Sequence, residues 1–434
     1  MRNLLLQNCT LQPSLLKGFS KSGSSKHFYF RHFTMVLLFW FGGDAGCDLI
    51  SIDKNTSIAA ATFHSSLISI KGEGPLSPLL TSSTDYFRSR QSGNWSVPAT
   101  WESSADNNNW QLATDVPTKD ANTIRIQNGH TVSVINSVSL DQTVIYGILE
   151  LQAGGVLNIN DGTGDDIIIS ANGVLQIVST NTYANTIKQN GDANIHITTN
   201  GKIVIGNGAG VGAGYENFTT SAVNMWDDRS VYEFNSSIST FAIAALTFFP
   251  NAALTDIPIF RVTQIGGIPT TGTMKDFTVN GILEVNTSVT LAGSSKKTFR
   301  NGIRGTATLS QTGAGKFYLT APGAILDGTS LKIVLSQPMD LSPLSTIVPI
   351  GANVVINGAN INNTPTNPSG SHGDLIINGT LDVTTVNITN TGISKVTVNG
   401  TYRTAHPGGF SGSSSSIPAT TGIINLNPGS TIEL

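Results

Sequence analysis

The stretch Gly147-Ile-Leu-Glu-Leu151 places a glycine before an alternation of apolar and polar residues, and this pattern recurs along the chain. The other copies begin at Gly155, Gly173, Gly201, Gly281 and Gly379. In four of the six copies the glycine follows an asparagine, and Asn-Gly favours a turn with positive φ. Each copy therefore predicts a turn followed by a short strand with one buried face and one exposed face.

The spacing of these turns predicts how the strands are arranged. Asn357, Asn378 and Asn399 each precede a glycine and are 21 residues apart, and Gly281, Gly302 and Gly323 have the same spacing. One short strand cannot bury its apolar face alone, but stacked coils can line a common core. We therefore expect an all-β fold, a parallel β-solenoid (β-helix) of roughly 21-residue coils. Roughly a dozen coils would form a rod of about 55–65 Å.

Composition narrows the class of protein. Only 12% of the 434 residues are charged and the net charge is −3, so the chain lacks the basic surface that nucleic-acid binding requires. A hydrophobic content of 39% is too high for a disordered chain. Cys9 and Cys47 are the only cysteines, so the body from residue 48 onward has no disulfide and no thiolate metal site.

The N-terminal segment has the features of an export signal. Five basic residues and no acid precede a compact apolar run that begins at Met35 and is too short to span a bilayer. We expect a secreted protein, extracellular or on the outer cell surface, with no transmembrane span beyond this segment. A lipid anchor on Cys47 and a disordered tail are the alternatives. The true start is either Met1 or Met35.

The chain divides into five predicted segments. They are an export signal and disordered lead-in (1–84), a Trp-rich β entry and capping module (85–140), a β-solenoid (141–205), an irregular aromatic β insertion (206–277) and a second β-solenoid (278–434) that is expected to continue beyond Leu434.

Three of the five tryptophans, Trp95, Trp101 and Trp110, fall within 16 residues of the entry module. They could form a platform on which sugars stack. Stacked repeats also need an atypical terminal coil that closes the end of the core, and aromatic side chains bury large areas. We favour the cap over the ligand platform.

The entry module also carries a resemblance. Ser92-Gly-Asn-Trp-Ser-Val-Pro-Ala-Thr-Trp-Glu102 and Asn128-Gly-His-Thr-Val-Ser-Val134 resemble the opening of large secreted surface proteins of Bacteroidetes-type bacteria, which has a G8-like β domain. Proteins of that family are exported by type IX secretion. The resemblance covers roughly residues 86–434 and implies a cell-surface or adhesive protein, and no enzymatic activity comes with it. No C-terminal sorting module of the family is recognisable.

One acidic cluster has the spacing of metal ligands. Asp161, Asp165 and Asp166 lie in a stretch that nearly matches a calcium-binding nonapeptide repeat, and carboxylates suit Ca²⁺. Such sites are built from tandem copies, and the chain has one copy. We therefore favour an ordinary Asp/Gly turn and predict no metal and no cofactor, with calcium as the weaker alternative.

No catalytic residue is predicted. Asp227, Asp228, Arg229 and Glu233 could serve a polysaccharide lyase, but lyase residues should recur on successive coils. At 21-residue offsets we find Asn, Thr and Gly, so we expect no repeated chemistry on the outer face. His130 lies beside a turn and is interpreted as structural.

The sequence therefore favours a non-enzymatic secreted or surface protein whose solenoid is a stalk or display scaffold. The alternative is a carbohydrate-binding or lyase-like β-helix protein. Expected partners are cell-surface glycans or other surface proteins, and the chain is expected to be monomeric.

Overall fold

The structure, a computed structural model, describes part of the chain. The described residues are 36–39, 48–51, 80–180, 186–206, 223–236, 257–265, 277–291, 293–294, 296–363, 373–390, 395–418 and 423–434. Two compact units are present, Met1–Ser77 and Pro78–Leu434. In the first, β1 (Val36–Phe39) and β2 (Asp48–Ser51) pair antiparallel. The rest of the expected export signal and lead-in up to residue 79, with Cys9 and Cys47, lies outside the described residues.

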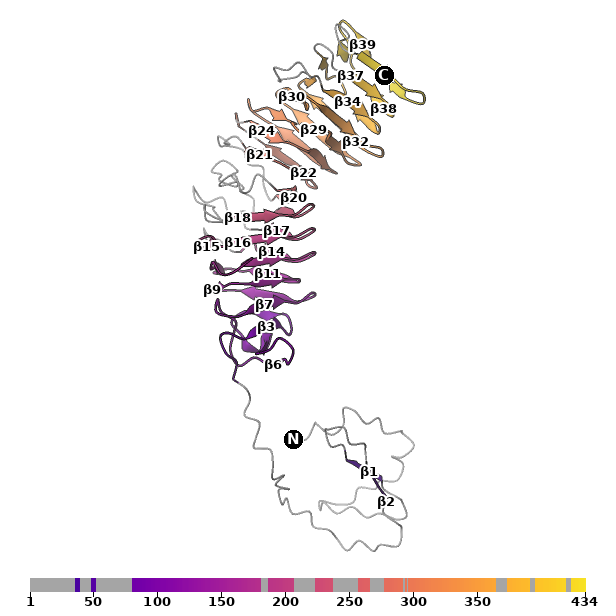
Figure 1. Ribbon diagram of the computed structural model, residues 1–434. Helices are drawn as coiled ribbons and strands as arrows, with labels where there is room; N and C mark the ends of the chain where they lie inside the picture. Colours follow the sequence, from indigo (N-terminus) through magenta and orange to yellow (C-terminus); the bar gives the residue numbers. More distant parts are fainter. Residues whose placement is uncertain are drawn as a thin grey trace, which may run out of the picture. The chain divides into compact units, whose positions relative to one another are not determined.

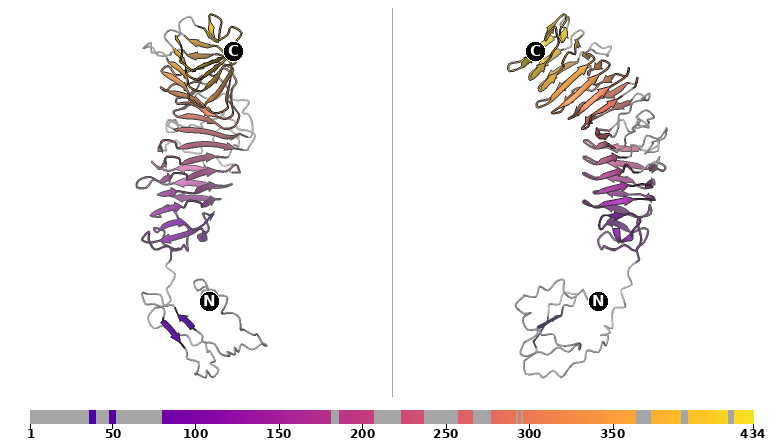
Figure 2. Two further views of the ribbon diagram at one scale, coloured as in Figure 1. Left: turned by 90° about the vertical axis from the view of Figure 1, so that its right-hand side faces the viewer. Right: turned by 180° about the vertical axis from the view of Figure 1, so that it is seen from behind.

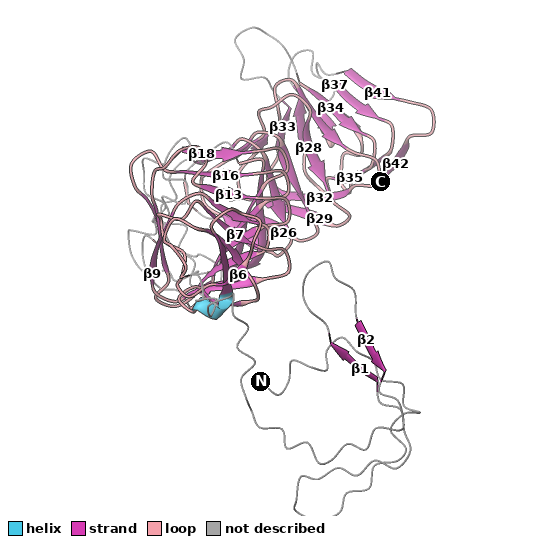
Figure 3. Ribbon diagram, turned by 60° about the horizontal axis from the view of Figure 1, so that its bottom comes forward, coloured by secondary structure: helices cyan, strands magenta, loops and turns pink. Residues whose placement is uncertain are grey.

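The second unit is a stack of short parallel strands (Figure 1), which confirms the all-β, parallel β-solenoid fold. The strands form successive rungs in the side view and in the view from behind (Figure 2). The described residues contain one short helix, the 3-10 turn η2 (Pro98–Thr100), drawn in cyan in Figure 3. A search of the described residues for an apolar helix of membrane-spanning length found none.

The long sheet, with 14 strands, extends from the entry module to the last coil. At about 4.8 Å per strand it is about 60 Å long. Its strands, in spatial order, are β4 (Gly93–Asn94), β8 (Thr131–Val134), β11 (Ile148–Leu151), β14 (Val174–Ile177), β17 (Lys202–Ile205), β19 (Val231–Ser236), β20 (Ile259–Ile265), β22 (Ile282–Val285), β25 (Gly302–Gly305), β28 (Ala324–Asp327), β31 (Ser345–Val348), β34 (Asp374–Ile377), β37 (Lys395–Val398) and β41 (Ile423–Leu426).

Two further sheets complete the first coils. The N-terminal sheet has eight strands: β18 (Val223–Trp226), β16 (Asn194–Ile197), β13 (Ile167–Ile169), β10 (Thr143–Ile145), β7 (Thr123–Ile126), β3 (Tyr86–Ser89), β5 (Trp101–Ser104) and β6 (Gln111–Leu112). The short sheet has three: β15 (Ile187–Gln189), β12 (Val156–Ile159) and β9 (Ser137–Leu140). In the entry module β5 pairs antiparallel with β3 and β6, unlike the parallel coils.

Other sheets complete the later coils. The six-stranded sheet contains β21 (Phe277–Val279), β24 (Lys297–Phe299), β27 (Phe317–Tyr318), β30 (Met339–Asp340), β33 (Ile361–Asn363) and β36 (Ile388–Asn390). The seven-stranded sheet contains β23 (Val289–Leu291), β26 (Thr308–Gln311), β29 (Leu331–Leu335), β32 (Asn353–Gly358), β35 (Thr380–Asp382), β38 (Thr401–Arg403) and β42 (Thr431–Glu433). A two-stranded sheet pairs β39 (Ser411–Gly412) with β40 (Ile417–Pro418).

The recurring glycine is required by close packing between coils. A Cβ on Gly173 would lie 2.0 Å from the carbonyl oxygen of Ile145 in the coil before, so no larger residue fits there. The positive φ that the Asn-Gly pair was expected to place at glycine is found at the asparagine here, with 67° at Asn172. Asparagine tolerates this left-handed conformation better than most residues.

The alternation of the strands produces the buried core. In β11, Leu149 and Leu151 are fully buried while Glu150 faces outward, and the same pattern recurs in β14. The buried side chains form two clusters, one in the first coils and one in the later coils. Phe260 of β20 packs against both clusters, so the core passes through this strand from one half to the other.

The coils do not have the constant length that the sequence suggested. Along the long sheet from β8 onward, the register step grows from 17 residues (Thr131 to Ile148) to 29 (Lys202 to Val231), and it equals 21 only from Asp374 to Lys395. Gly302 pairs with Ile325, so Gly323 is out of register. The turns between strands absorb these differences, because loop length is weakly constrained energetically.

Much of the expected insertion at 206–277 lies outside the described residues. The described parts continue the stack, because β19 pairs in parallel with β17 and β20, and β20 pairs with β22. The pairing of β19 with β20 contains one irregularity between Phe234 and Asn235. The solenoid therefore runs through this region, and the two predicted solenoid segments share one continuous sheet.

Candidate functional site

The two tryptophans of the cap are buried in the core. Trp95 and Trp101 are 2% and 0% exposed, and their rings meet edge to face with centroids 4.9 Å apart. The indole N–H of Trp95 donates to the Pro117 carbonyl at 3.1 Å, and that of Trp101 donates to the Trp95 carbonyl at 2.8 Å. Aromatic pairs of this kind stabilise a core beyond their buried area. Neither ring is available to a ligand.

Trp110 differs from these two because it is only half-buried. The guanidinium of Arg88 lies over its ring, 4.2 Å from the centroid, and Arg88 also donates to Glu102 at 2.8 Å. Of the three tryptophans singled out in the sequence, Trp110 is the one that reaches the surface.

The structure separates the three aspartates of the calcium candidate. Asp166 is buried and accepts hydrogen bonds from the backbone N–H groups of Gly162 (2.8 Å) and Asn194 (2.7 Å), so it joins two coils. Asp161 is exposed and accepts a long bond from Asp192 N at 3.4 Å. Among the described residues, no group of three or more His, Cys, Asp or Glu side chains could hold a metal ion. The cluster therefore acts as a set of turn-forming carboxylates there.

Asp165 instead joins a histidine bridge. His196 of β16 contacts Asp165 through Nδ1 at 3.0 Å and Asp227 through Nε2 at 3.1 Å. Burial disfavours the charge on the ring, but the hydrogen bonds to Asp227 and Asp165 outweigh it, so the pKa of His196 is raised above its ordinary value. Nearby, burial and the hydrogen bond to Asp166 raise the pKa of the Asp141 carboxyl to about 6. We call these residues, Asp141, Asp161, Asp165, Asp166, His196 and Asp227, the acidic corner.

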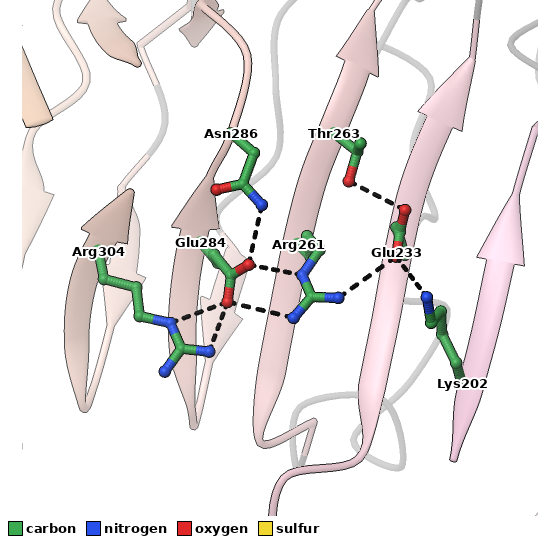
Figure 4. Close-up of polar contacts among 7 residues, drawn as sticks. All are labelled: Lys202, Glu233, Arg261, Thr263, Glu284, Asn286 and Arg304. Carbon is green, nitrogen blue, oxygen red and sulfur yellow. Dashed lines mark hydrogen bonds and ion pairs between the residues drawn. The ribbon is translucent and has the colours of Figure 1, made fainter. Parts of the chain in front are cut away.

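A ladder of alternating charges crosses the outer face of the long sheet (Figure 4). Glu233, Arg261, Glu284 and Arg304 are register partners on β19, β20, β22 and β25. Lys202 reaches Glu233 at 3.2 Å from β17. We call these five residues the charge ladder.

The two glutamates of the charge ladder are held tightly. Glu284 accepts from Arg261 Nε at 2.6 Å, Arg304 Nε at 2.8 Å and Asn286 Nδ2 at 2.9 Å. Glu233 accepts from Thr263 at 2.9 Å and faces Arg261 at 3.5 Å. Burial opposes the charge on Glu284, yet the bonds from Arg261, Arg304 and Asn286 lower its pKa. Both carboxylates are saturated with donors and are only 6% and 8% exposed.

The charge ladder corrects the expectation that the outer face carries no repeated chemistry. Its members are 28, 23 and 20 residues apart, so a search at 21-residue offsets misses them. The signal that could have revealed them is the position of each charge within its strand, two residues after the first apolar residue of β19, β20 and β22. The histidine bridge carries no comparable signal, because its residues come from two turns and one strand.

The residues considered for a lyase are not brought together. Glu233 belongs to the charge ladder on the long sheet, whereas Asp227 ends β18 in the N-terminal sheet and binds His196. Arg229 lies in an exposed turn with φ of 63°. His130 contacts the buried Ser89 hydroxyl at 2.8 Å through Nδ1, which fits the structural role predicted for it.

The comparisons with known proteins leave the chain on its own. Neither the protein-family models, nor the curated proteins, nor the solved structures that were searched contain a match.

Proposed function

We propose that the chain is a non-enzymatic secreted or cell-surface protein whose β-solenoid is a stalk or display scaffold. The observation that carries the proposal is the long sheet of 14 strands, which passes without a break through the region expected to interrupt it. A continuous hydrogen-bonded sheet resists bending and holds its two ends apart, which is what a spacer requires.

The state of the charged side chains supports a structural role over a catalytic one. A general base or acid must reach its substrate, and a lyase needs carboxylates that can take up a cation. In the charge ladder each glutamate is covered by cations and amides of neighbouring strands. These contacts join coils and offer no unsatisfied carboxylate to a substrate.

The secreted or surface location is part of the proposal. It is supported by the basic and apolar N-terminal segment and by the resemblance of the entry module to G8-like openings of secreted bacterial surface proteins. The low charge of the later coils fits the same location, since only six charged residues lie between Asp340 and Leu434.

The alternative, sugar binding by the three tryptophans, loses two of its residues. Trp95 and Trp101 are buried and hydrogen-bonded to the backbone, so a sugar could reach them only if the cap unfolded. Only Trp110 remains for contact with a ligand.

The location is tested on intact cells of the source organism with antibodies raised against the full chain. We expect the protein in the medium or on the cell surface, where added protease degrades it without lysis. Recovery only from the cell interior would contradict the proposal. Polysaccharide degradation by the purified chain that Glu233→Gln abolishes, with the fold intact, would overturn the non-enzymatic assignment.

A further inference from the structure

The outer face of the cap carries two arginines side by side. Arg88 of β3 and Arg125 of β7 are register partners on parallel strands, and both side chains are half-buried on the outer face. Like charges on adjacent strands repel each other unless an opposite charge lies near. Glu102, the partner of Arg88 on its other side, supplies that charge to Arg88 at 2.8 Å.

Arg125 has no such partner among the described residues. Its Nη1 donates to the neutral side-chain oxygen of Asn107 at 2.9 Å, and no described carboxylate lies within ion-pair distance of it. The next strand of the sheet places Val144 beside it. A guanidinium has five N–H donors in a planar fork that suits the two oxygens of a carboxylate or sulfate.

The loop between β5 and β6 is built so that it covers this pair. Asp106 accepts hydrogen bonds from the backbone N–H groups of Asn108 (2.9 Å) and Asn109 (2.8 Å) and from the Ser104 hydroxyl (2.9 Å). These bonds, the backbone ones foremost, lower the pKa of Asp106. The Asp106 carboxylate therefore serves its own turn, and Asn107, with φ of 62°, is directed toward Arg125.

The same loop ends at Trp110, whose ring lies against Arg88. A half-buried indole next to an arginine without an acidic partner combines an aromatic surface with an anion-binding group. Aromatic rings pack against the apolar faces of sugar rings, and the arginine fork binds an acidic substituent. The surface is open rather than enclosed, which suits one segment of a polymer better than a small molecule that must be surrounded.

We propose that Trp110, Arg125 and Arg88 form a binding site on the cap for an acidic saccharide, one that carries carboxylate or sulfate groups. The site deepens the adhesive side of the proposed function and gives the scaffold a ligand at its capped end. Trp110 packs against a sugar ring, Arg125 binds the acidic group, and Asn107 holds the Arg125 side chain in place.

The test measures binding of the full chain to polygalacturonate, dextran sulfate and neutral dextran by affinity electrophoresis at physiological salt. We expect retardation by at least one acidic polymer and none by neutral dextran. Which acidic polymer binds identifies the acidic group. Arg125→Gln and Trp110→Leu should each weaken the binding by tenfold or more, and melting curves establish that both variants are folded.

Arg300→Gln is the matched control, because Arg300 is an exposed arginine that also has an asparagine partner, Asn280 at 3.4 Å, in a later coil. It should bind within twofold of the unaltered chain. If Trp110→Leu fails to fold, Trp110→Phe keeps an aromatic ring, and Arg125→Gln alone decides. Equal weakening in the Arg300 control, or no binding of either acidic polymer, would overturn the site. Neither result bears on the location of the protein, which the labelling of intact cells tests separately.

Discussion

Glu284 lies between two arginines that face it from neighbouring strands, and its removal should be costly. Glu284→Gln keeps the shape of the side chain but leaves Arg261 and Arg304 facing each other without a shared anion. We expect a loss of about 2 kcal/mol in the free energy of unfolding, because a charge-assisted contact is lost and two cations are left partly buried. Urea denaturation measures it.

The control for this substitution is Glu433→Gln. Glu433 forms an ion pair with Arg403 in the last coil, but this pair is exposed to solvent. Exposed pairs contribute little to stability, so its removal should leave the unfolding midpoint almost unchanged. Similar losses at both positions would contradict the special role of the charge ladder.

Gly173 tests the close approach of the coils. Gly173→Ala places a methyl group 2.0 Å from the Ile145 carbonyl and should cost about 3 kcal/mol of stability, since the two coils must move apart. Gly129→Ala is the matched control, because Gly129 has φ of 80° and no atom within 4 Å of the added Cβ. It should cost only about 1 kcal/mol, the strain of a left-handed alanine. Equal costs would mean that backbone conformation, and not packing, selects the glycine.

Single residues show where sequence reasoning succeeded and where it could not. The inward positions of β11 and β14, Leu149 and Leu175 among them, were predicted from alternation alone, because a strand has a fixed period of two. The contacts of Glu284 were not, because they depend on which strands become neighbours. That depends on the number of residues in each turn, which no local pattern encodes.

The acidic corner makes the stability of the first coils depend on pH. The pKa of His196 is raised above its ordinary 6.5, so its charge stabilises the fold fully below pH 6.5. This contribution is lost as the pH rises through the folded-state pKa. Asp141 acts in the same direction, because its pKa rises from 3.8 to about 6 and its ionisation over that range disfavours the folded state.

His196→Gln should therefore lower the melting temperature more at pH 5 than at pH 8, as measured by circular dichroism. The glutamine cannot carry the charge that holds Asp165 and Asp227. His406→Gln, at a turn in a later coil where His406 accepts from Gly408 N, should not show the same widening at low pH. A His196 variant with an equal effect at both pH values would contradict a charged bridge.

The strands and turns were largely predictable, and the length of each coil was not. Stacking at a constant 21 residues correctly aligns Asn378 with Asn399, whose side chains are hydrogen-bonded at 2.7 Å. It wrongly adds Asn357, which lies in β32 of a different sheet. The solenoid tolerates coils of different length because only the strands must match, while the turns project into solvent.

The solenoid as a whole should tolerate the loss of one complete coil. Asp374 and Lys395 are register partners, so deletion of residues 374–394 brings β31 next to β37 with the inward positions preserved. We expect the shortened chain to unfold cooperatively, with a smaller m-value because less surface is buried. Deletion of residues 374–383 removes part of a coil and should abolish the cooperative transition. If both deletions behave alike, the later coils are not interchangeable rungs.

The central claim is that one parallel sheet continues through β19, β20 and β22, and disulfide trapping tests it most directly. In a Cys9→Ser, Cys47→Ser background the chain has no other thiols. Val231 and Ile259 are register partners on β19 and β20, so their Cα atoms should be about 4.8 Å apart, within the range of a disulfide. Val231→Cys with Ile259→Cys should therefore form a bond on mild oxidation, as Ile148→Cys with Val174→Cys should in the first coils.

The pair Val174→Cys and Val231→Cys, two rungs apart through Lys202, should remain as free thiols. Peptide mapping of the oxidised protein identifies the bonds. The account predicts a bond in the first two pairs and none in the third. A bond at Ile148 and Val174 together with free thiols at Val231 and Ile259 would show that the sheet is broken in the middle, and would contradict the continuous scaffold.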